Sequence, residues 1–313
     1  MTEPNLKITL DFTGVDQPAL RAAFRKAIRD HAVTVLSPAD PSPIAVPGVP
    51  RIGLSAKASE YKTWHDDKLP GADFGRVFSA PGEGLPSWSS LAVKGLTARG
   101  INVWASAKDR ASAVSYTRMF DGIPAGVDLT FTHHHEPIAD GVDPDDYLAE
   151  YKLIREVADD HPNRDRIHIF PVLEAHAMRF KDLDWRSYTA VDNRTGAQYA
   201  DGIAFDSYWR EDLDYEAPES LIGMPVLAAS EFGYGRWRLA ELGATTTRKG
   251  RALWFREVVD AAGAAGCEAI GLWCSRKTIK VKGKPVELDY RPVDEQTLAA
   301  WRALLDLNQQ RPA

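Results

Sequence analysis

Two glutamates stand where acid–base and nucleophilic chemistry would need them. Glu136 nearly closes the run GVDLTFTHHHEP, and Glu231 lies in MPVLAASEFGYG. Each follows a short, mostly apolar segment of strand-like composition, so each should stand where the chain leaves a sheet. Carboxylates just beyond the carboxyl ends of buried strands carry the chemistry of α/β barrels. A pair of them, one acid and one nucleophile, is what cleavage of a glycosidic bond with retention requires.

Eight strand-like segments must position this pair, and from residue 49 onward they alternate with amphipathic helical stretches. We predict strands over 51–55, 75–79, 101–106, 127–132, 167–173, 202–206, 225–229 and 269–273. Glu136 then follows the fourth strand and Glu231 the seventh, with room for three βα units of ordinary length between them. The pattern predicts an α/β fold, a (β/α)8 TIM barrel over 49–313. An open doubly wound sheet is the alternative, although no glycine-rich nucleotide-binding motif supports it.

Helices between the strands have ordinary start signals. Asp143 followed by Pro144 predicts an N-cap and a first-turn proline. Other helices are predicted for RKGRALWFREVVDAAGAAG and for the C-terminal DEQTLAAWRALLDLNQQ. Residues 1–48 differ, because a strand-like LKITLDF and an amphipathic QPALRAAFRKAIRDHA precede a proline-rich segment. We therefore expect a small N-terminal appendage with a linker over 1–48.

Composition excludes several classes of function. The chain has 313 residues, 44% hydrophobic and 26% charged, and a formal net charge of −6, which gives a nucleic-acid partner no electrostatic support. No apolar run reaches the roughly 20 residues of a membrane span. The N-terminus has no signal-peptide pattern, so a cytoplasmic location is expected, with phage delivery and non-classical export as alternatives. Cys267 and Cys274 are expected to be buried thiols in a reducing compartment.

The motifs around the two glutamates resemble those of clan A retaining glycoside hydrolases. His135-Glu136-Pro137 after strand four and Glu231-Phe232-Gly233 after strand seven carry the resemblance. Most members of the clan have asparagine before the acid, and the histidine here is closest to family 26-like members. The resemblance implies that Glu136 is the acid/base and Glu231 the nucleophile. It also implies that His135 contacts the sugar hydroxyl beside the reacting carbon.

The same resemblance gives roles to two aromatic residues. It implies that Tyr208, at the end of strand six, hydrogen-bonds the nucleophile. It implies that Trp273, at the end of strand eight, forms the floor under the reacting sugar. The sequence IADG stands at 138–141, where true mannanases carry a tryptophan-rich signature, so the resemblance does not extend to mannan as the substrate.

Further side chains at or beyond the predicted strand ends are candidates for contacts with a sugar. They are His134, Glu174, His176, Asp206, Arg76, Trp104, Trp209 and Tyr234. A basic group such as Arg76 would keep a nearby nucleophile ionised. Several candidates have a structural alternative: a core position for Trp104, an exposed loop pair for Glu174 and His176, a cap for Asp206, and packed loops for the other aromatics.

Three consecutive histidines, His133 to His135, raise the alternative of a metal site. Zinc needs three or four ligands converging on one point. Neighbouring residues of a strand point to opposite faces, so three in a row cannot all converge from a regular strand. No metal and no cofactor are therefore predicted.

The expected protein is a glycosidase that acts on an oligo- or polysaccharide by a two-glutamate double displacement. The alternative from another class is a non-catalytic carbohydrate-binding module, or an assembly module of a phage tail or cell-surface complex. A metal-dependent hydrolase using the histidines is a third interpretation. The sequence specifies neither the sugar, nor the linkage, nor endo or exo action, nor the oligomeric state.

Overall fold

The computed structural model describes residues 49–56, 60–175, 178, 184–209, 217–281 and 284–309. They all belong to Ser42–Ala313, the larger of two compact units into which the chain divides; the other is Met1–Pro41. The elements predicted within 1–48 lie outside the described residues. The division into an appendage over 1–48 and a barrel over 49–313 stays a prediction.

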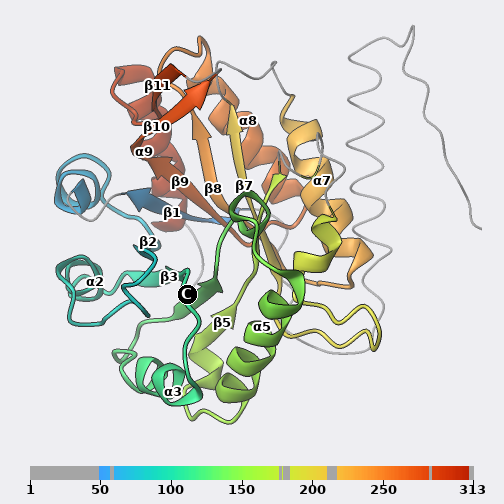
Figure 1. The fold of residues 1–313 in the computed structure, drawn as a ribbon. Coiled ribbons are helices and arrows are strands. Elements are labelled where there is room, and N and C mark those ends of the chain that lie inside the picture. The colour runs from blue at the N-terminus through green and yellow to red at the C-terminus, as the bar shows by residue number, and fades with distance from the viewer. Residues whose placement is uncertain are drawn as a thin grey trace, which may run out of the picture. The chain divides into compact units, whose positions relative to one another are not determined.

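Nine parallel strands form one sheet in the order β5-β4-β3-β2-β1-β9-β8-β7-β6 (Figure 1). Their bounds are β1 Arg51–Ala56, β2 Phe74–Ser79, β3 Asn102–Ala107, β4 Leu129–His133, β5 Ile167–Ile169, β6 Val172–Glu174, β7 Ile203–Trp209, β8 Trp237–Ala244 and β9 Ala269–Cys274. Most positions along these strands are buried, and every residue of β4 and β8 is buried. Such continuous burial is expected for parallel strands that are covered on both faces.

The two edge strands of this sheet are halves of one barrel strand. Only Phe170 and Pro171 separate β5 from β6. The Phe170 N–H donates to the Phe131 carbonyl on β4, and the Pro171 carbonyl accepts from Ala204 on β7. Pro171 lacks an N–H and so interrupts the strand at this point. The sheet therefore closes on itself as an eight-stranded (β/α)8 barrel, as the sequence predicts.

Helices follow the strands and pack outside them. They are α2 Leu91–Thr97, α3 Ala113–Asp121, α4 Pro137–Asp140, α5 Pro144–Asp159, α7 Pro218–Glu231, α8 Arg251–Ala264 and α9 Glu295–Gln309. A π-helix, η2 Lys62–Lys68, and two short 3-10 helices, η3 Arg164–Arg166 and η4 Trp185–Tyr188, complete the helical elements of the described residues. The predicted start of α5 is confirmed, because the Asp143 carboxylate accepts from two first-turn N–H groups. No helix in the described ranges has the length and apolar run of a membrane span.

Seven of the eight predicted strands are confirmed, and the seventh is wrong. Residues 225–229 lie inside helix α7, and the barrel strand at that place is β8, Trp237–Ala244. Buried positions of α7 recur at helical spacing, at Leu221, Ile222, Pro225, Ala228 and Ala229. A short apolar run cannot be assigned to strand or helix by hydrophobicity alone. The recurrence of apolar residues at helical spacing over 221–229, rather than at every second position, would have indicated the helix.

An extra residue in β8 sets the direction of its side chains. Phe205 of β7 is paired with Leu239, but the next residue, Asp206, is paired with Glu241, so Ala240 has no partner of its own. The register against β9 shifts by the same one residue between Leu239 and Leu242. A β-bulge of this kind changes which face the following residues occupy. Glu241 therefore shares a face with Asp206, although Ala240 also belongs to the barrel core.

Glycine at position 271 makes room for this bulge. A Cβ added at Gly271 on β9 would lie 2.3 Å from the Ala240 carbonyl oxygen. The same Cβ would lie 3.5 Å from the ring of Phe74, which fills the barrel interior. A backbone carbonyl cannot move as cheaply as a side-chain tip, so any larger residue must displace β8 itself.

We expect Gly271→Ala to destabilise the fold by about 1–3 kcal/mol, because the new methyl group overlaps the bulged backbone of β8. Urea unfolding monitored by tryptophan fluorescence measures the change. Gly235→Ala is the matched control, since a Cβ there meets no atom within 4 Å. Equal unfolding midpoints for Gly271→Ala and wild type would contradict the assigned role of this glycine.

Candidate functional site

A buried arginine lies at the centre of the polar groups inside the barrel. Arg76 on β2 is 0% exposed. Its Nη1 lies 2.8 Å from Glu241 Oε1 and 3.4 Å from Asp206 Oδ1, and its Nη2 donates to Ser106 Oγ at 3.2 Å. The guanidinium also lies over the ring of Phe78, 4.7 Å from the centroid. One cation thus connects carboxylates from two neighbouring strands.

Three donors converge on the Glu241 carboxylate. Besides Arg76, the Ser55 hydroxyl donates to Oε1 at 3.3 Å, and the Tyr208 hydroxyl donates to Oε2. Glu241 is only 3% exposed, so these contacts are shielded from competing water. Arg76, Ser55 and Tyr208 together fix the position of this carboxylate inside the barrel.

Glu136 reaches the same mouth from a strained turn beyond β4. His134 and Glu136 both have positive φ, 46° and 56°, in the left-handed region that side chains other than glycine rarely adopt. The Glu136 N–H is held by the Val172 carbonyl at 3.1 Å, and the His134 N–H by the Ala107 carbonyl at 2.7 Å. Left-handed residues of this kind cluster at functional sites because neighbouring structure must hold them in place. The turn directs Glu136 inward.

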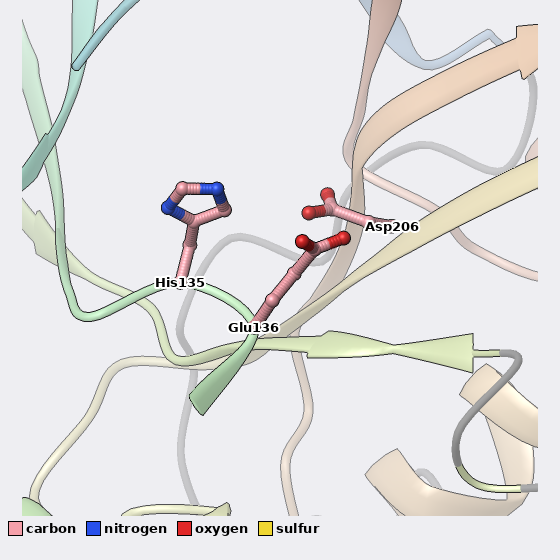
Figure 2. Close-up of side chains that lie close together, drawn as sticks. All are labelled: His135, Glu136 and Asp206. Atoms are coloured by element: carbon pink, nitrogen blue, oxygen red, sulfur yellow. The ribbon is translucent and has the colours of Figure 1, made fainter. Parts of the chain in front are cut away.

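The carboxyl groups at the mouth compete for ionisation. Burial, and then the charge of Glu174, raise the pKa of Glu136 from 4.5 to about 7, and Glu241 acts in the same direction. Burial and the Glu241 charge also raise the pKa of Asp206 well above its ordinary value. Figure 2 shows the carboxyl groups of Glu136 and Asp206 directed toward each other beside the ring of His135. A protonated Glu136 can therefore exist near neutral pH.

Register explains why these acids meet. Glu174 on β6 is paired with Asp206 on β7, and Asp206 is paired with Glu241 on β8. Side chains at paired positions of parallel strands share a face of the sheet. Three acidic residues from three consecutive strands therefore form one row inside the barrel. Glu136 faces this row from the turn after β4.

Aromatic side chains border the site on the other side. Trp273, near the end of β9, meets Phe78 of β2 edge-on with ring centroids 6.2 Å apart. Phe78 lies 5.1 Å from the ring of His135. Trp273 and Phe78 are both partly exposed, so their faces are available to an apolar surface such as one side of a sugar ring. Burial, followed by the charge of Arg76, keeps the pKa of His135 well below its ordinary value, so the ring is neutral.

One set of side chains here has the donors of a metal site. Single ligand atoms of His135, Glu136 and Asp206 lie within 4.8 Å of one another, and no other such set occurs among the described residues. One imidazole and two carboxylates can bind a divalent cation. However, the Arg76 guanidinium already contacts Asp206, and its charge opposes a second cation. His133 is buried against Tyr151 and His134 bonds Asp140, so the three histidines do not form one ligand set.

The structure corrects the position of Glu231. It ends helix α7 on the outer layer, in the connection that leads into the amino end of β8 rather than at the carboxyl end of a strand. Its carboxylate forms a two-pronged ion pair with Arg186 at 2.6 and 3.1 Å, and its side chain is 33% exposed. Glu231 thus has the surroundings of a surface ion pair. Glu241, on strand β8, occupies the place in the barrel that was predicted for Glu231.

Several predicted sugar contacts are placed elsewhere. Trp104 is 1% exposed and donates to Thr132, so it is core beneath the site. Trp209 is buried against Trp254. Tyr234 is buried as well, and its hydroxyl donates to the Thr189 carbonyl, in the connection that precedes β8.

Other predicted residues have mixed outcomes. His134 is partly exposed but bonds Asp140 and the Lys108 carbonyl. His176 lies outside the described residues. The structure brings the remaining predicted residues together. Arg76 and Tyr208 contact Glu241, and Asp206 contacts Arg76. His135 lies beside Glu136, Glu174 is paired with Asp206, and Trp273 packs on Phe78.

Sequence reasoning missed three members of the site: Glu241, Ser55 and Phe78. Glu241 was overlooked because β8 reads WRLAELGA, and its two charged residues, Arg238 and Glu241, made it look like a polar loop. Both are in fact buried. The signal that would have found the strand is the alternation itself, since a βα barrel needs a strand between α7 and α8.

Comparison with known proteins bears on the fold. The sequence matches no protein-family model and no curated protein. The structure is similar to a glucosidase from Croceicoccus marinus, with TM-score 0.56 and 10% identity over 83% of this chain and 68% of that one. It is similar to a fungal β-1,4-galactanase, with TM-score 0.56 and 10% identity over 82% and 100% of the two chains. A GH26 β-mannanase from Bacteroides ovatus gives TM-score 0.51 and 11% identity over 92% and 93%.

These similarities support the barrel as the fold that such glycoside hydrolases share. At 10–11% identity they do not identify a family, and the resemblance to family 26-like members stays a prediction.

The raised pKa of Glu136 predicts a pH-dependent gain of stability in Glu136→Gln. In wild type, the folded protein loses stability as pH rises from 4.5 through about 7, because the buried carboxyl must ionise. The neutral amide avoids that cost. We expect the variant to be more stable than wild type by on the order of 2 kcal/mol at pH 8 and about equally stable at pH 4. The expected gain is smaller than the full pKa shift would give, because part of the Glu136 side chain reaches solvent. Urea unfolding at both pH values measures this. An equal difference at pH 4 and pH 8 would contradict the assignment.

Proposed function

We propose that this chain is a retaining glycosidase in which Glu136 is the acid/base and Glu241 is the nucleophile. The observation that carries the proposal is the environment of Glu241: three donors fix a buried carboxylate inside the barrel mouth, opposite an acid whose pKa is raised to about 7. Two neighbouring acidic groups with unlike environments are typical of the acid and the nucleophile in such enzymes.

In the first step, protonated Glu136 gives its proton to the glycosidic oxygen while that bond to the anomeric carbon breaks. A Glu241 oxygen attacks the same carbon, so a glycosyl–enzyme ester forms and the leaving group departs as an alcohol. Arg76 and Tyr208 hold Glu241 in line for the attack. In this proposal, the neutral ring of His135 and the carboxyl group of Asp206, which lie beside Glu136, form hydrogen bonds with sugar hydroxyls.

In the second step, Glu136 has become a carboxylate and acts as a base. It takes a proton from water, the water oxygen attacks the anomeric carbon, and the ester to Glu241 breaks. The loss of the Glu241 charge during the ester stage lowers the electrostatic cost of ionising Glu136, because Glu241 is one of the groups that raise its pKa. In this mechanism the negative charge is therefore on Glu241 before the first step and on Glu136 while the ester exists.

The substrate class is inferred from the aromatic and acidic side chains around the two carboxyl groups. Partly exposed Phe78 and Trp273 offer apolar faces beside a row of hydrogen-bonding acids, a combination that suits a polyhydroxylated ring. The structurally similar proteins named above are glycosidases that act on glucosides, galactans or mannans by their names. The proposed substrate is therefore an oligo- or polysaccharide.

Separate alanine variants test the two roles. On a panel of 4-nitrophenyl glycosides and polysaccharides, Glu241→Ala should reduce turnover to background, and Glu136→Ala should reduce it by about 10²–10⁴-fold. With a 2,4-dinitrophenyl glycoside, whose leaving group needs no proton, Glu136→Ala should form the ester at close to the wild-type rate. Glu241→Ala should not recover with that substrate.

Glu231→Ala is the matched control, because it removes a carboxylate of the same chemistry from the helix layer. It should keep wild-type turnover. Wild-type activity in Glu241→Ala, or inactivity confined to Glu231→Ala, would contradict the proposal.

A further inference from the structure

A basic hairpin follows the last barrel strand. Strands β10 Arg276–Val281 and β11 Lys284–Asp289 are antiparallel. The first of them, β10, begins two residues after β9 ends. Residues 276–284 read RKTIKVKGK, with five cations and no acid, in a chain whose formal net charge is −6. Because β9 is a barrel strand, the hairpin extends from the mouth of the barrel.

One face of this hairpin is turned toward the barrel. Lys277 is paired with Leu288, which is buried, and Tyr290 follows two residues later, so the three side chains share a face. The ring of Tyr290 lies 5.4 Å from that of Tyr208, the residue that bonds Glu241. Arg276 is on the other face, where it pairs with Asp289 at 3.1 Å. Lys277 therefore projects on the side of the site.

The charge of Lys277 acts on the acid side of the site. It lowers the pKa of both Glu136 and His135, against the raising effect of burial on Glu136. Lys277 is exposed and forms no ion pair within the described ranges, whereas Lys108, the other lysine that acts on His135, pairs with Asp140. An unpaired cation beside a general acid works against catalysis unless something negative neutralises it when substrate binds.

We propose that Lys277 recognises an anionic group on the substrate, so that the preferred glycan carries a carboxylate or a sulfate on the leaving-group side. This inference rests on the proposed function, because it uses Glu136 as the group that protonates the leaving oxygen. The sugar that departs must lie against Glu136, and Lys277 is the one cation acting on Glu136 that has no ion pair among the residues the structure describes. A bound anion would cancel the positive field of Lys277 at Glu136 and keep that acid protonated during the first step.

Binding to the inactive Glu241→Ala protein tests the inference without turnover. Calorimetry compares oligouronates with their carboxyl-reduced forms, and sulfated galactan oligosaccharides with their desulfated forms. The anionic member of at least one pair should bind more tightly, and Lys277→Gln should weaken that binding by about tenfold while Lys277→Arg preserves it. The pair that responds identifies whether a carboxylate or a sulfate is the recognised group. Raising the salt concentration should weaken the same binding.

Lys152→Gln is the matched control, since Lys152 is an exposed lysine on the outer helix α5. It should bind all probes as the parent protein does. Equal affinity for the anionic and neutral members of every pair, or unchanged binding in Lys277→Gln, would overturn the inference. Failure of the proposed function would appear separately, as activity retained by Glu241→Ala.

Discussion

The buried ion cluster around Arg76 is the interaction on which the candidate site depends. A guanidinium with no solvent exposure lies between Asp206 and Glu241, with Ser106 on its other nitrogen and the Phe78 ring over its face. A buried cation is costly to desolvate and persists only where opposing charge and hydrogen bonds offset that cost. Its charge offsets the repulsion between the carboxyl groups of Asp206 and Glu241, which come from neighbouring strands. Arg76 therefore holds these two carboxyl groups in place, while burial raises the pKa of Glu136 to about 7.

Backbone irregularities bring the side chains to this cluster. The bulge at Ala240 rotates Glu241 into the interior, and Gly271 leaves space for the displaced carbonyl. Left-handed residues His134 and Glu136 turn the chain after β4 toward the same point. A regular strand and a relaxed turn would send both acids elsewhere. The two carboxyls of the proposed mechanism thus each depend on a local departure from regular geometry, held by hydrogen bonds from neighbouring strands.

The barrel was predictable from sequence because its signals are local and repeated. Apolar strands, Asp143-Pro144 and amphipathic helices all indicate the same alternation, and Glu136, Arg76 and Tyr208 fall where strand-end chemistry was expected. The seventh strand failed for a physical reason. The sequence of β8 contains the charged residues Arg238 and Glu241, so it resembles a surface loop although both side chains are buried. The sequence of α7 is apolar enough to resemble a strand. Burial of Arg238 depends on Glu268, Thr130 and the Phe170 ring, contacts that no local pattern reveals.

The most direct measurement of the central claim is the identity of the residue that becomes covalently attached to the sugar. A panel of 2-deoxy-2-fluoroglycosyl fluorides slows hydrolysis of the glycosyl ester, so the ester can be found by peptide mass spectrometry after proteolysis. The account predicts one sugar adduct, on the peptide that contains Glu241. An adduct on Glu231, Asp206 or Glu174 would contradict it.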